Sequence, residues 1–337
     1  MAQASDQMAQ QLREAWFRFV DTIEPIRPGL YRYCRRLTRN VWDAEDLVQE
    51  TLMRAFPAVA RGEKWGSPRA YLFRIASNAW IDEVRRSETR RAIEIEDQRM
   101  TAPEDSLATR DAAAKLIEKA SPQERAAVLL KDVFDFSIEE VADLLSTTEG
   151  AIKSALHRAR HQLQDTKDIP RPNRRGPSKE LLDKFVAAFE SRDVSAITGL
   201  LLENVTLEVL GIGGERGKAM VWVHSSLDLP TPNNPNPPQR HWVSEVVQFQ
   251  GEWIVVIWQA PRSASILVGV NRFEEVEGRI ARIREYHFCP DTIAEIAAAL
   301  GAGAVTHGYR HTPPVLANVI ASAELPWKIG RIRDLPG

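Results

Sequence analysis

The residues best suited to chemistry lie in one short stretch, 147–160, with the sequence TTEGAIKSALHRAR. Its cationic side chains can neutralise phosphates, and its serine can hydrogen-bond a phosphate or a base edge. At helical spacing the polar residues share an outward face: Lys153, Ser154, His157, Arg158, Arg160 and His161. The opposite face is apolar: Ile152, Leu156, Ala159 and Leu163. This pattern predicts a helix that binds nucleic acid, in which His157 suits a phosphate as well as a base.

The composition of the whole chain limits how far this basic character extends. The 337 residues include 44 Lys and Arg against 46 Asp and Glu, a net charge of −2. That balance excludes a protein that coats nucleic acid along its entire surface, but it allows a few basic faces. Cys34 and Cys289 lie far apart, so we expect no disulfide framework, zinc site or other cofactor. The N-terminus lacks the apolar core of a signal peptide, and no run could span a bilayer, so we expect a soluble cytoplasmic protein without membrane contact.

The basic helix must be positioned by the elements just before it. In residues 137–146, Ser137 and Glu140 form a capping-box pattern at the start of a short helix. A polar turn follows at 146–148, and the basic helix comes next. Two short helices joined by a tight turn, the second basic, are the helix-turn-helix signature. A further helix opens upstream with Ser-Pro at 121–122.

Two more helices are predicted earlier in the chain. In 43–60, apolar residues form one stripe: Ala44, Leu47, Val48, Leu52 and Phe56. Polar residues lie mostly outside it: Asp43, Glu45, Asp46, Gln49 and Glu50. In 67–86, Ser67 is the predicted N-cap and Pro68 the first helical residue. The core-facing residues there are Leu72, Ile75, Ala76, Ala79 and Val84.

The section after residue 178 has a different character. Two short helices precede several runs that alternate or are apolar as strands are, which predicts an α+β domain with an antiparallel sheet. We expect a helix over 214–227, a Pro/Asn loop over 230–239 and a final helix near 290–300. Polar linkers are predicted before and after the helix-turn-helix, the first beginning at 92.

Taken together, residues 30–165 resemble the extracytoplasmic-function (ECF) sigma factors of bacterial RNA polymerase. The stretch LYRYCRRLTRNVWDAEDLVQETLMRAF resembles sigma regions 2.1 to 2.2, SPRAYLFRIASNAWIDEVRR regions 2.3 to 2.4, and 121–163 region 4. The section after 178 resembles the SnoaL-like domains that one branch of this family carries. The implied fold is multidomain: two all-α sigma domains and a C-terminal α+β SnoaL-like cone-shaped domain.

The resemblance implies limits for each part of the chain. They are 10–95 for sigma region 2, 96–110 for a linker, 111–166 for region 4, 167–178 for a Pro/Arg-rich linker, 179–300 for the SnoaL-like domain and 301–337 for a tail. The tail itself gives no clear structural pattern.

The resemblance also implies partners and residue roles. The expected partners are the RNA polymerase core, through its β′ clamp helices and β flap, and promoter DNA. Polymerase contacts would come from Asp43, Glu45, Asp46, Gln49 and Glu50. Contacts to the minus-ten element would come from Arg74, Asn78, Asp82, Arg85, Arg86, Arg90 and Arg91. Contacts to the minus-thirty-five element would come from Lys153, Ser154, His157, Arg158 and Arg160.

Structural interpretations compete with several of these roles. The acidic face could simply be solvated, and Asp82 could pair with Arg85 or Arg86 along its helix. Trp80 suits a core or an interface better than a platform for a base. The whole chain could also be a helix-turn-helix regulator that does not bind polymerase.

The sequence of the C-terminal domain is compatible with several functions. The SnoaL-like class includes cyclases and isomerases that use Asp, His or Tyr, and the candidates here are His224, Asp228, His241, Tyr286 and His287. Nothing in their spacing specifies a site, so we expect no enzyme but a domain that regulates sigma activity in cis. Its own partner could be a small-molecule ligand or a regulatory protein. The tryptophans Trp222, Trp242, Trp253 and Trp258 suit its core better than a pocket.

Overall fold

The computed structural model describes residues 2–63, 65–99, 121–160, 176–211, 213–217, 242–260 and 265–306. The chain divides into two compact units. One is Pro25–Ile169, and the other combines Met1–Glu24 with Pro170–Gly337. Helix α1 (Ala2–Ile23) precedes the first of these units in the sequence.

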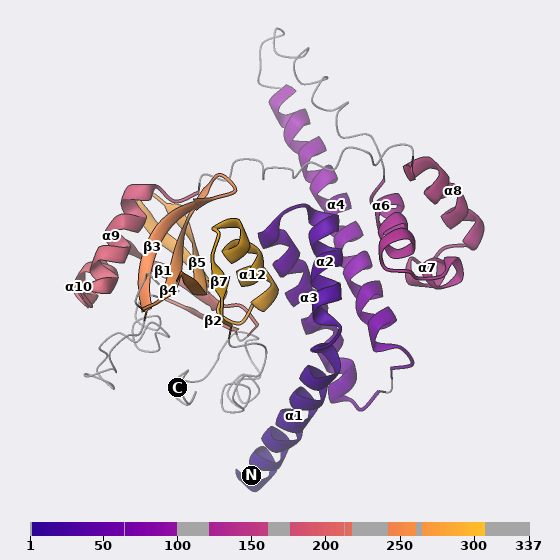
Figure 1. The fold of residues 1–337 in the computed structure, drawn as a ribbon, viewed down its shortest axis with the longest axis horizontal. Helices are drawn as coiled ribbons and strands as arrows, with labels where there is room; N and C mark the ends of the chain where they lie inside the picture. Colours follow the sequence, from indigo (N-terminus) through magenta and orange to yellow (C-terminus); the bar gives the residue numbers. More distant parts are fainter. Residues whose placement is uncertain are drawn as a thin grey trace. The chain divides into compact units, whose positions relative to one another are not determined.

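The first helical section, 25–99, consists of three helices that pack in sequence order (Figure 1). They are α2 (Arg27–Thr38), α3 (Val41–Ala60) and α4 (Pro68–Arg99). The Asn40 side chain caps α3 by accepting from the backbone N–H groups of Trp42 and Asp43 at 2.9 and 3.1 Å. Ser67 caps α4, as predicted, since its Oγ accepts from Ala70 N–H at 3.2 Å.

The apolar stripes predicted for α3 and α4 are largely confirmed. Ala44, Leu47, Val48 and Leu52 are buried on α3, and Leu72, Ala76 and Ala79 on α4, whereas Phe56, Ile75 and Val84 are only partly covered. The predicted start of a linker at 92 was wrong, because α4 continues to Arg99. Residues 92–99 are mostly good helix formers, and the first proline comes only at 103.

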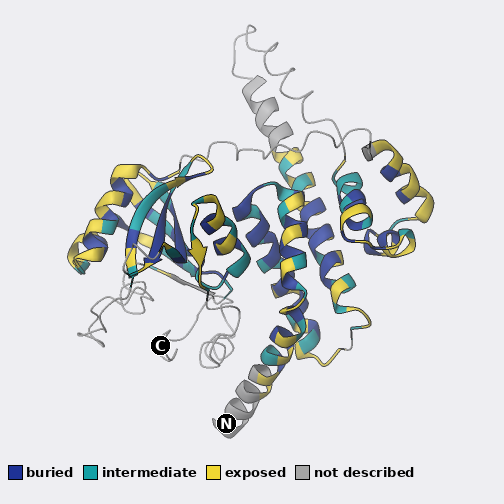
Figure 2. Ribbon diagram, in the orientation of Figure 1, coloured by how far each residue is buried: buried dark blue, intermediate teal, exposed yellow. Residues whose placement is uncertain are grey.

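The second helical section, 121–160, contains the predicted helix-turn-helix. Its elements are α6 (Pro122–Val128), a π-helical turn (Leu129–Val133), α7 (Ile138–Leu144) and α8 (Glu149–Arg160). Helix α8 packs on α6 and α7, so its apolar side is covered within this section. Figure 2 shows the opposite side of α8 as an exposed face.

The C-terminal part is an α+β domain with the predicted helix-strand order. Two helices come first, α9 (Lys179–Glu190) and α10 (Val194–Leu200). The strands are β1 (Leu201–Val209), β2 (Gly213–Arg216), β3 (Trp242–Phe249), β4 (Glu252–Gln259), β5 (Ile266–Val276), β6 (Arg279–Glu285) and β7 (Gly303–Ala304). Helix α12 (Pro290–Ala299) packs on β5 and β7.

The sheet is mixed, so the prediction of an antiparallel sheet was wrong. Its order is β2-β1-β6-β5-β4-β3, with β7 beside β5. Strand β1 pairs parallel with β6, and β5 pairs parallel with β7, while the other pairs are antiparallel. Alternation of apolar and polar side chains identifies the buried face of a strand. It does not show whether the strand runs parallel or antiparallel to its neighbour.

Two tight turns fix the register of the antiparallel strands β3 to β6. Gln250-Gly251 joins β3 to β4 and Glu277-Gly278 joins β5 to β6, and all four residues have positive φ. Two consecutive positive φ values are characteristic of the type I′ hairpin turn, whose twist matches that of the flanking strands. The second residue of each turn is glycine, which adopts this conformation without a steric cost.

The helix predicted over 214–227 was wrong at its start, because Gly213–Arg216 form strand β2. This strand pairs with the end of β1, where Val209 faces Gly213. Residues 218–241 lie outside the described part of the chain, as does nearly all of the tail from 307 onward.

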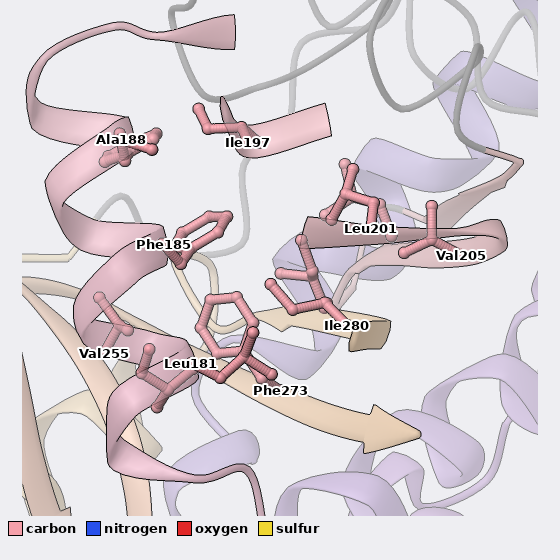
Figure 3. Close-up of a cluster of buried hydrophobic side chains, with 13 residues drawn as sticks. Leu181, Phe185, Ala188, Ile197, Leu201, Val205, Val255, Phe273 and Ile280 are labelled. Atoms are coloured by element: carbon pink, nitrogen blue, oxygen red, sulfur yellow. The ribbon is translucent and has the colours of Figure 1, made fainter. Parts of the chain in front are cut away.

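The core of the domain lies between α9, α10 and one face of the sheet (Figure 3). Phe185 of α9 stacks on Phe189 with ring centroids 5.7 Å apart, and meets Phe273 of β5 edge-on at 4.9 Å. Leu207 and Ile283 extend this cluster onto β1 and β6. Burial of these large apolar side chains supplies the main stabilisation of the domain.

Candidate nucleic-acid interfaces

Local hydrogen bonds position the helix-turn-helix. The capping box predicted for α7 is present, with Ser137 Oγ accepting from Glu140 N–H at 3.0 Å and Ser137 N–H donating to Glu140 Oε2 at 2.7 Å. Ser121 and Glu124 form a second capping box on α6. The turn between α7 and α8 passes through Ser146, whose φ is +50°. Thr148 Oγ1 then accepts from Ala151 N–H at 3.2 Å and starts α8.

The predicted polar face of α8 is exposed. Lys153, Ser154, His157 and Arg158 are solvent-accessible, whereas Ile152 and Leu156 are buried. The side chain of Arg160 and all of His161 lie outside the described part. Four polar side chains on one accessible helix face can reach into a major groove, as the sequence pattern predicts.

Carboxylates hold two of the cations of α8. Lys153 Nζ lies 3.2 Å from Glu149 Oε2, and Arg158 Nε lies 2.6 Å from Glu124 Oε1. Partial burial would raise the pKa of Glu124, but hydrogen bonds from Ser121 N–H and Arg158 outweigh it, so the pKa is lowered. The carboxylate therefore stays ionised, and a DNA phosphate must compete with it for Arg158.

The predicted minus-ten residues lie on an exposed face of α4. Arg74, Asn78, Asp82, Arg85, Arg86 and Arg90 are all exposed, while the side chain of Arg91 lies outside the described part. Glu83 binds two of the arginines, Arg86 at 3.2 Å and Arg90 at 2.8 Å. The pairing proposed for Asp82 was wrong, because Arg86 pairs with Glu83 and only its Nε approaches the Asp82 carbonyl, at 3.4 Å.

Trp80 has a structural role, as predicted. Only 7% of its surface is exposed, and the guanidinium of Arg125 lies 5.7 Å from its ring centroid. Its ring is therefore covered by the protein itself and offers no free face to a nucleic-acid base.

The polar face of α3 is accessible in four of its five predicted positions. Asp43, Asp46, Gln49 and Glu50 are partly exposed, and Glu50 pairs with Arg54 at 2.6 Å. The expectation that Glu45 lies on this face was wrong, because its side chain is fully buried. At about 100° per residue, position 45 falls inside the apolar stripe of Val41, Val48 and Leu52.

Glu45 instead forms a buried ion pair that the sequence interpretation missed. Arg27 Nη2 donates to Glu45 Oε1 at 2.5 Å, both side chains are fully buried, and Gln49 Nε2 donates to the same oxygen at 2.6 Å. The pair ties the start of α2 to α3 and places Gln49 on the polar face. The available sequence signal was a glutamate within an apolar stripe, which requires a buried cation as partner.

The catalytic candidates of the C-terminal domain do not form a described cluster. His224, Asp228 and His241 lie outside the described residues. Tyr286 is fully buried, with the Arg284 guanidinium 5.8 Å from its ring centroid. His287 is partly exposed, its Nε2 lies 4.0 Å from Glu285 Oε2, and its ring covers Gly269 so closely that a Cβ there would lie 2.4 Å from it.

Two of the three described tryptophans of this domain serve its packing. Trp258 is 2% exposed, and its indole N–H donates to Glu245 Oε2 at 2.7 Å. Trp253 packs against the hydrophobic core and lies under Lys179, whose Nζ is 5.7 Å from the ring centroid. The prediction of a structural role is confirmed for these two, while Trp222 lies outside the described residues.

The described residues lack two features that would point to other functions. No helix among them combines the length and the apolar character needed to cross a membrane. In the same residues, no three His, Cys, Asp or Glu side chains are grouped so that they could hold a metal ion.

Two family models match the helical part of the chain. The model of sigma-70 region 2 matches residues 22–91, and that of sigma-70 region 4 matches residues 110–163. The α4 and α8 faces described above therefore fall in separate sigma regions. In the C-terminal part, an NTF2-like protein of Burkholderia xenovorans matches 32% of this chain and 80% of its own, at 18% identity and a TM-score of 0.25.

Curated relatives point the same way. The ECF RNA polymerase sigma factor SigG of Mycobacterium tuberculosis is 30% identical over 221 residues, which cover 55% of this chain and 60% of SigG. SigL of the same organism is 36% identical over 149 residues, covering 41% of this chain and 81% of SigL. The crystal structure of M. tuberculosis SigJ matches 79% of this chain and 95% of SigJ, at 20% identity and a TM-score of 0.29. The helical motifs, the two family models and the similarity to SigL together show that the chain belongs to the ECF sigma factors.

Proposed function

We propose that this protein directs bacterial RNA polymerase to promoters and helps to open them. The proposal assigns 10–95 to polymerase and minus-ten binding, 111–166 to minus-thirty-five binding, and 179–300 to regulation in cis. Residues 96–110 and 167–178 are the proposed connections, although α4 extends into the first. The setting would be the cytoplasm, where promoter DNA and polymerase meet.

One observation carries the proposal: two separate helical sections each expose a basic face, in the order that the two promoter elements require. The α4 face supplies arginines and Asn78, which suit phosphates and unstacked bases. The α8 face supplies Lys153, Ser154, His157 and Arg158 for a major groove. Arg91 and Arg160 are added by the sequence pattern alone.

Polymerase binding is assigned to the polar face of α3, without Glu45. Partly exposed Asp43, Asp46, Gln49 and Glu50 lie beside an apolar stripe and suit a basic partner helix such as the β′ clamp helices. The β flap would be the partner of the second helical section. Glu45 contributes indirectly, because its oxygen holds the Gln49 amide.

The test is transcription in vitro with core polymerase and genomic promoter fragments. The chain should support promoter-specific initiation, and failure on every fragment would contradict the proposal. Asp46→Lys combined with Glu50→Lys should weaken the complex with core enzyme at least tenfold. The matched control, Glu180→Lys with Asp183→Lys, reverses two exposed charges on α9 and should leave binding unchanged.

The same experiment separates the alternative of a helix-turn-helix regulator without polymerase docking. A regulator of that kind would bind an operator as the free protein and would not be retained by core polymerase in a pull-down. Retention that is lost in the Asp46→Lys, Glu50→Lys variant supports the sigma-factor proposal instead.

For the C-terminal domain we favour regulation over catalysis. Tyr286, one of the candidate residues, has a ring that is enclosed by the protein. A small molecule or a regulatory protein would then act by changing sigma activity. Transcription by the full chain and by residues 1–177 should differ in yield at equal polymerase saturation, and equal yields would remove the regulatory role.

A further inference from the structure

Helix α2 carries a stripe of arginines that the proposed function does not use. Arg32, Arg36 and Arg39 are four and three positions apart, so they share one side of the helix and span about 10 Å along it. Arg32 and Arg36 are exposed, and Arg39 is partly exposed. In the described part of the chain, none of the three forms an ion pair. Arg54 and Arg61, two exposed arginines of the same section, each pair with a glutamate at 2.6 Å.

A pocket of about 360 Å³ lies against this stripe. Its volume is within the range of about 300 to 1,000 Å³ that is typical of small-molecule sites. Three guanidinium groups and one carboxylate line it, which gives a local net charge of +2. The residues come from α2, α4 and the segment that ends the π-helical turn, and they are Arg32, Arg36, Arg69, Val133, Phe134 and Asp135. The pocket is therefore complementary to an anion.

The wall opposite α2 is held in place by the protein itself. Arg69 Nη2 donates to the Phe134 carbonyl oxygen at 2.5 Å, and its guanidinium lies 4.3 Å from the Phe136 ring centroid. Asp135 follows in a left-handed conformation, with a φ of +58°, and forms no ion pair in the described part of the chain. A ligand would thus meet one arginine that is already ordered, which lowers the entropy cost of binding.

The basic stripe continues beyond the pocket toward α6. Arg125 Nε is buried, and no hydrogen-bond acceptor among the described residues reaches it. Burial lowers the pKa of Arg125, and repulsion from Arg39 lowers it further. Two neighbouring cations are thus held together at a cost that a bound anion would reduce.

The side chains of the pocket suit phosphate groups in particular. A guanidinium binds phosphate through two parallel hydrogen bonds, and Arg32 and Arg36 are one helical turn, or about 6 Å, apart. Adjacent phosphate groups of one molecule can therefore bind both arginines. A local charge of +2 requires at least two negative charges on the ligand. Val133, which is 37% exposed, can contact an apolar part of the same molecule.

We infer that this pocket binds a small molecule that carries two or three phosphate groups. Arg32 and Arg36 bind the phosphates from α2, Arg69 binds them from α4, and Asp135 weakens the binding through its charge. The inference goes beyond the proposed sigma function and does not depend on it, because the site can be measured in the free chain.

The test is calorimetric titration of the full chain with inorganic tripolyphosphate. One tripolyphosphate should bind per chain, and Arg32→Ala combined with Arg36→Ala should weaken this binding about tenfold or more. Arg32→Lys combined with Arg36→Lys keeps the charge and should lose less. Asp135→Asn should raise the affinity about threefold, since Asn tolerates a positive φ and removes the opposing charge.

The matched control is Arg54→Ala combined with Arg61→Ala, which removes two exposed arginines outside the pocket and should leave the affinity unchanged. The site is overturned if the Arg32→Ala, Arg36→Ala variant, shown to be folded by circular dichroism, binds tripolyphosphate as the wild type does.

A second titration, with a single-stranded DNA oligonucleotide, separates the two sources of phosphate. Oligonucleotide binding that depends on Arg32 and Arg36, without tripolyphosphate binding, would overturn the small-molecule site and make the stripe a nucleic-acid surface. Failure of the sigma function would appear differently, as no initiation with core polymerase, and would leave tripolyphosphate binding intact.

Discussion

The two helices proposed to bind DNA, α4 and α8, differ in how many of their cations are paired with carboxylates. On α8, Lys153 pairs with Glu149 of the same helix and Arg158 pairs with Glu124 of α6. On the described side chains of α4, Glu83 holds Arg86 and Arg90, whereas no ion pair within 4.0 Å engages Arg74 or Arg85. We expect a phosphate to bind Arg74 and Arg85 directly, whereas it must displace a carboxylate from Lys153 or Arg158. The α4 face should therefore supply more of the salt-sensitive affinity for DNA.

Removing cations from each helix should give the largest effect and the most direct test of this difference. Arg74→Ala with Arg85→Ala should weaken the promoter complex of the holoenzyme about tenfold or more. Its salt slope should fall by about 1.4, since each single-strand phosphate contact contributes about 0.7. Lys153→Ala with Arg158→Ala should cost about threefold. Titration of promoter DNA at several salt concentrations measures the affinity and the salt slope of both variants. Equal losses of affinity would contradict the larger contribution expected from α4.

The second prediction is that the second helical section, 121–160, loses stability at acid pH. The backbone N–H of Ser137 lowers the pKa of Glu140, and bonds from Ser121 and Arg158 lower that of Glu124 despite partial burial. Because the folded pKa lies below the unfolded one, this stabilisation is complete above about pH 4.5 and is lost as the pH falls through the folded value.

Hydrogen exchange of amides in α6 and α7 between pH 7 and pH 3 measures this loss. Ser121→Ala and Ser137→Ala should each remove about 1 kcal/mol at pH 7 and flatten the dependence on pH. An unchanged profile in both variants would show that the capping boxes do not control acid stability.

Removing the carboxylate that pairs with a cation of α8 should raise promoter affinity. This effect should be smaller than the losses expected from removing the cations. Glu124→Gln keeps a residue that can complete the capping box but removes the charge that holds Arg158. Promoter affinity should rise about two- to threefold at low salt. Glu149→Gln is the matched variant for Lys153, and a fall in affinity in both would contradict the proposed competition.

The smallest effect is expected from removing the ion pairs of Glu83 on α4, and it concerns the free energy of unfolding. Glu83 pairs with Arg86 and Arg90, but all three side chains are more than half exposed. Glu83→Gln should therefore change the stability of the first helical section by only a few tenths of a kcal/mol. A loss above 1 kcal/mol in thermal unfolding would show that these pairs are structural.

Much of the helical part could be predicted because its signals are local. Ser67, Ser137 and Glu140 cap their helices as expected, and the apolar stripes of α3, α4 and α8 mark the buried sides. Caps and stripes depend on residues three or four positions apart, which a sequence displays directly.

What could not be predicted depends on partners distant in sequence. Glu45 was placed on the surface because its partner, Arg27, lies 18 residues away. The parallel pairing of β1 with β6 joins Leu207 to Ile283 across the whole domain, and strand periodicity carries no sign of direction. The hydrogen bond from Arg69 to the Phe134 carbonyl oxygen links the two helical sections and was missed for the same reason, since the two residues are 65 positions apart.

The buried ion pair of the first helical section has a consequence for oxidation chemistry. Cys34 is fully buried on α2, and burial, together with the neighbouring Glu45 carboxylate, raises the pKa of its thiol well above the usual range. Since the thiolate is the nucleophile, this cysteine should be inert toward peroxide and alkylating reagents at neutral pH. The first helical section contains no other cysteine, so peroxide should find no reactive thiol there at neutral pH.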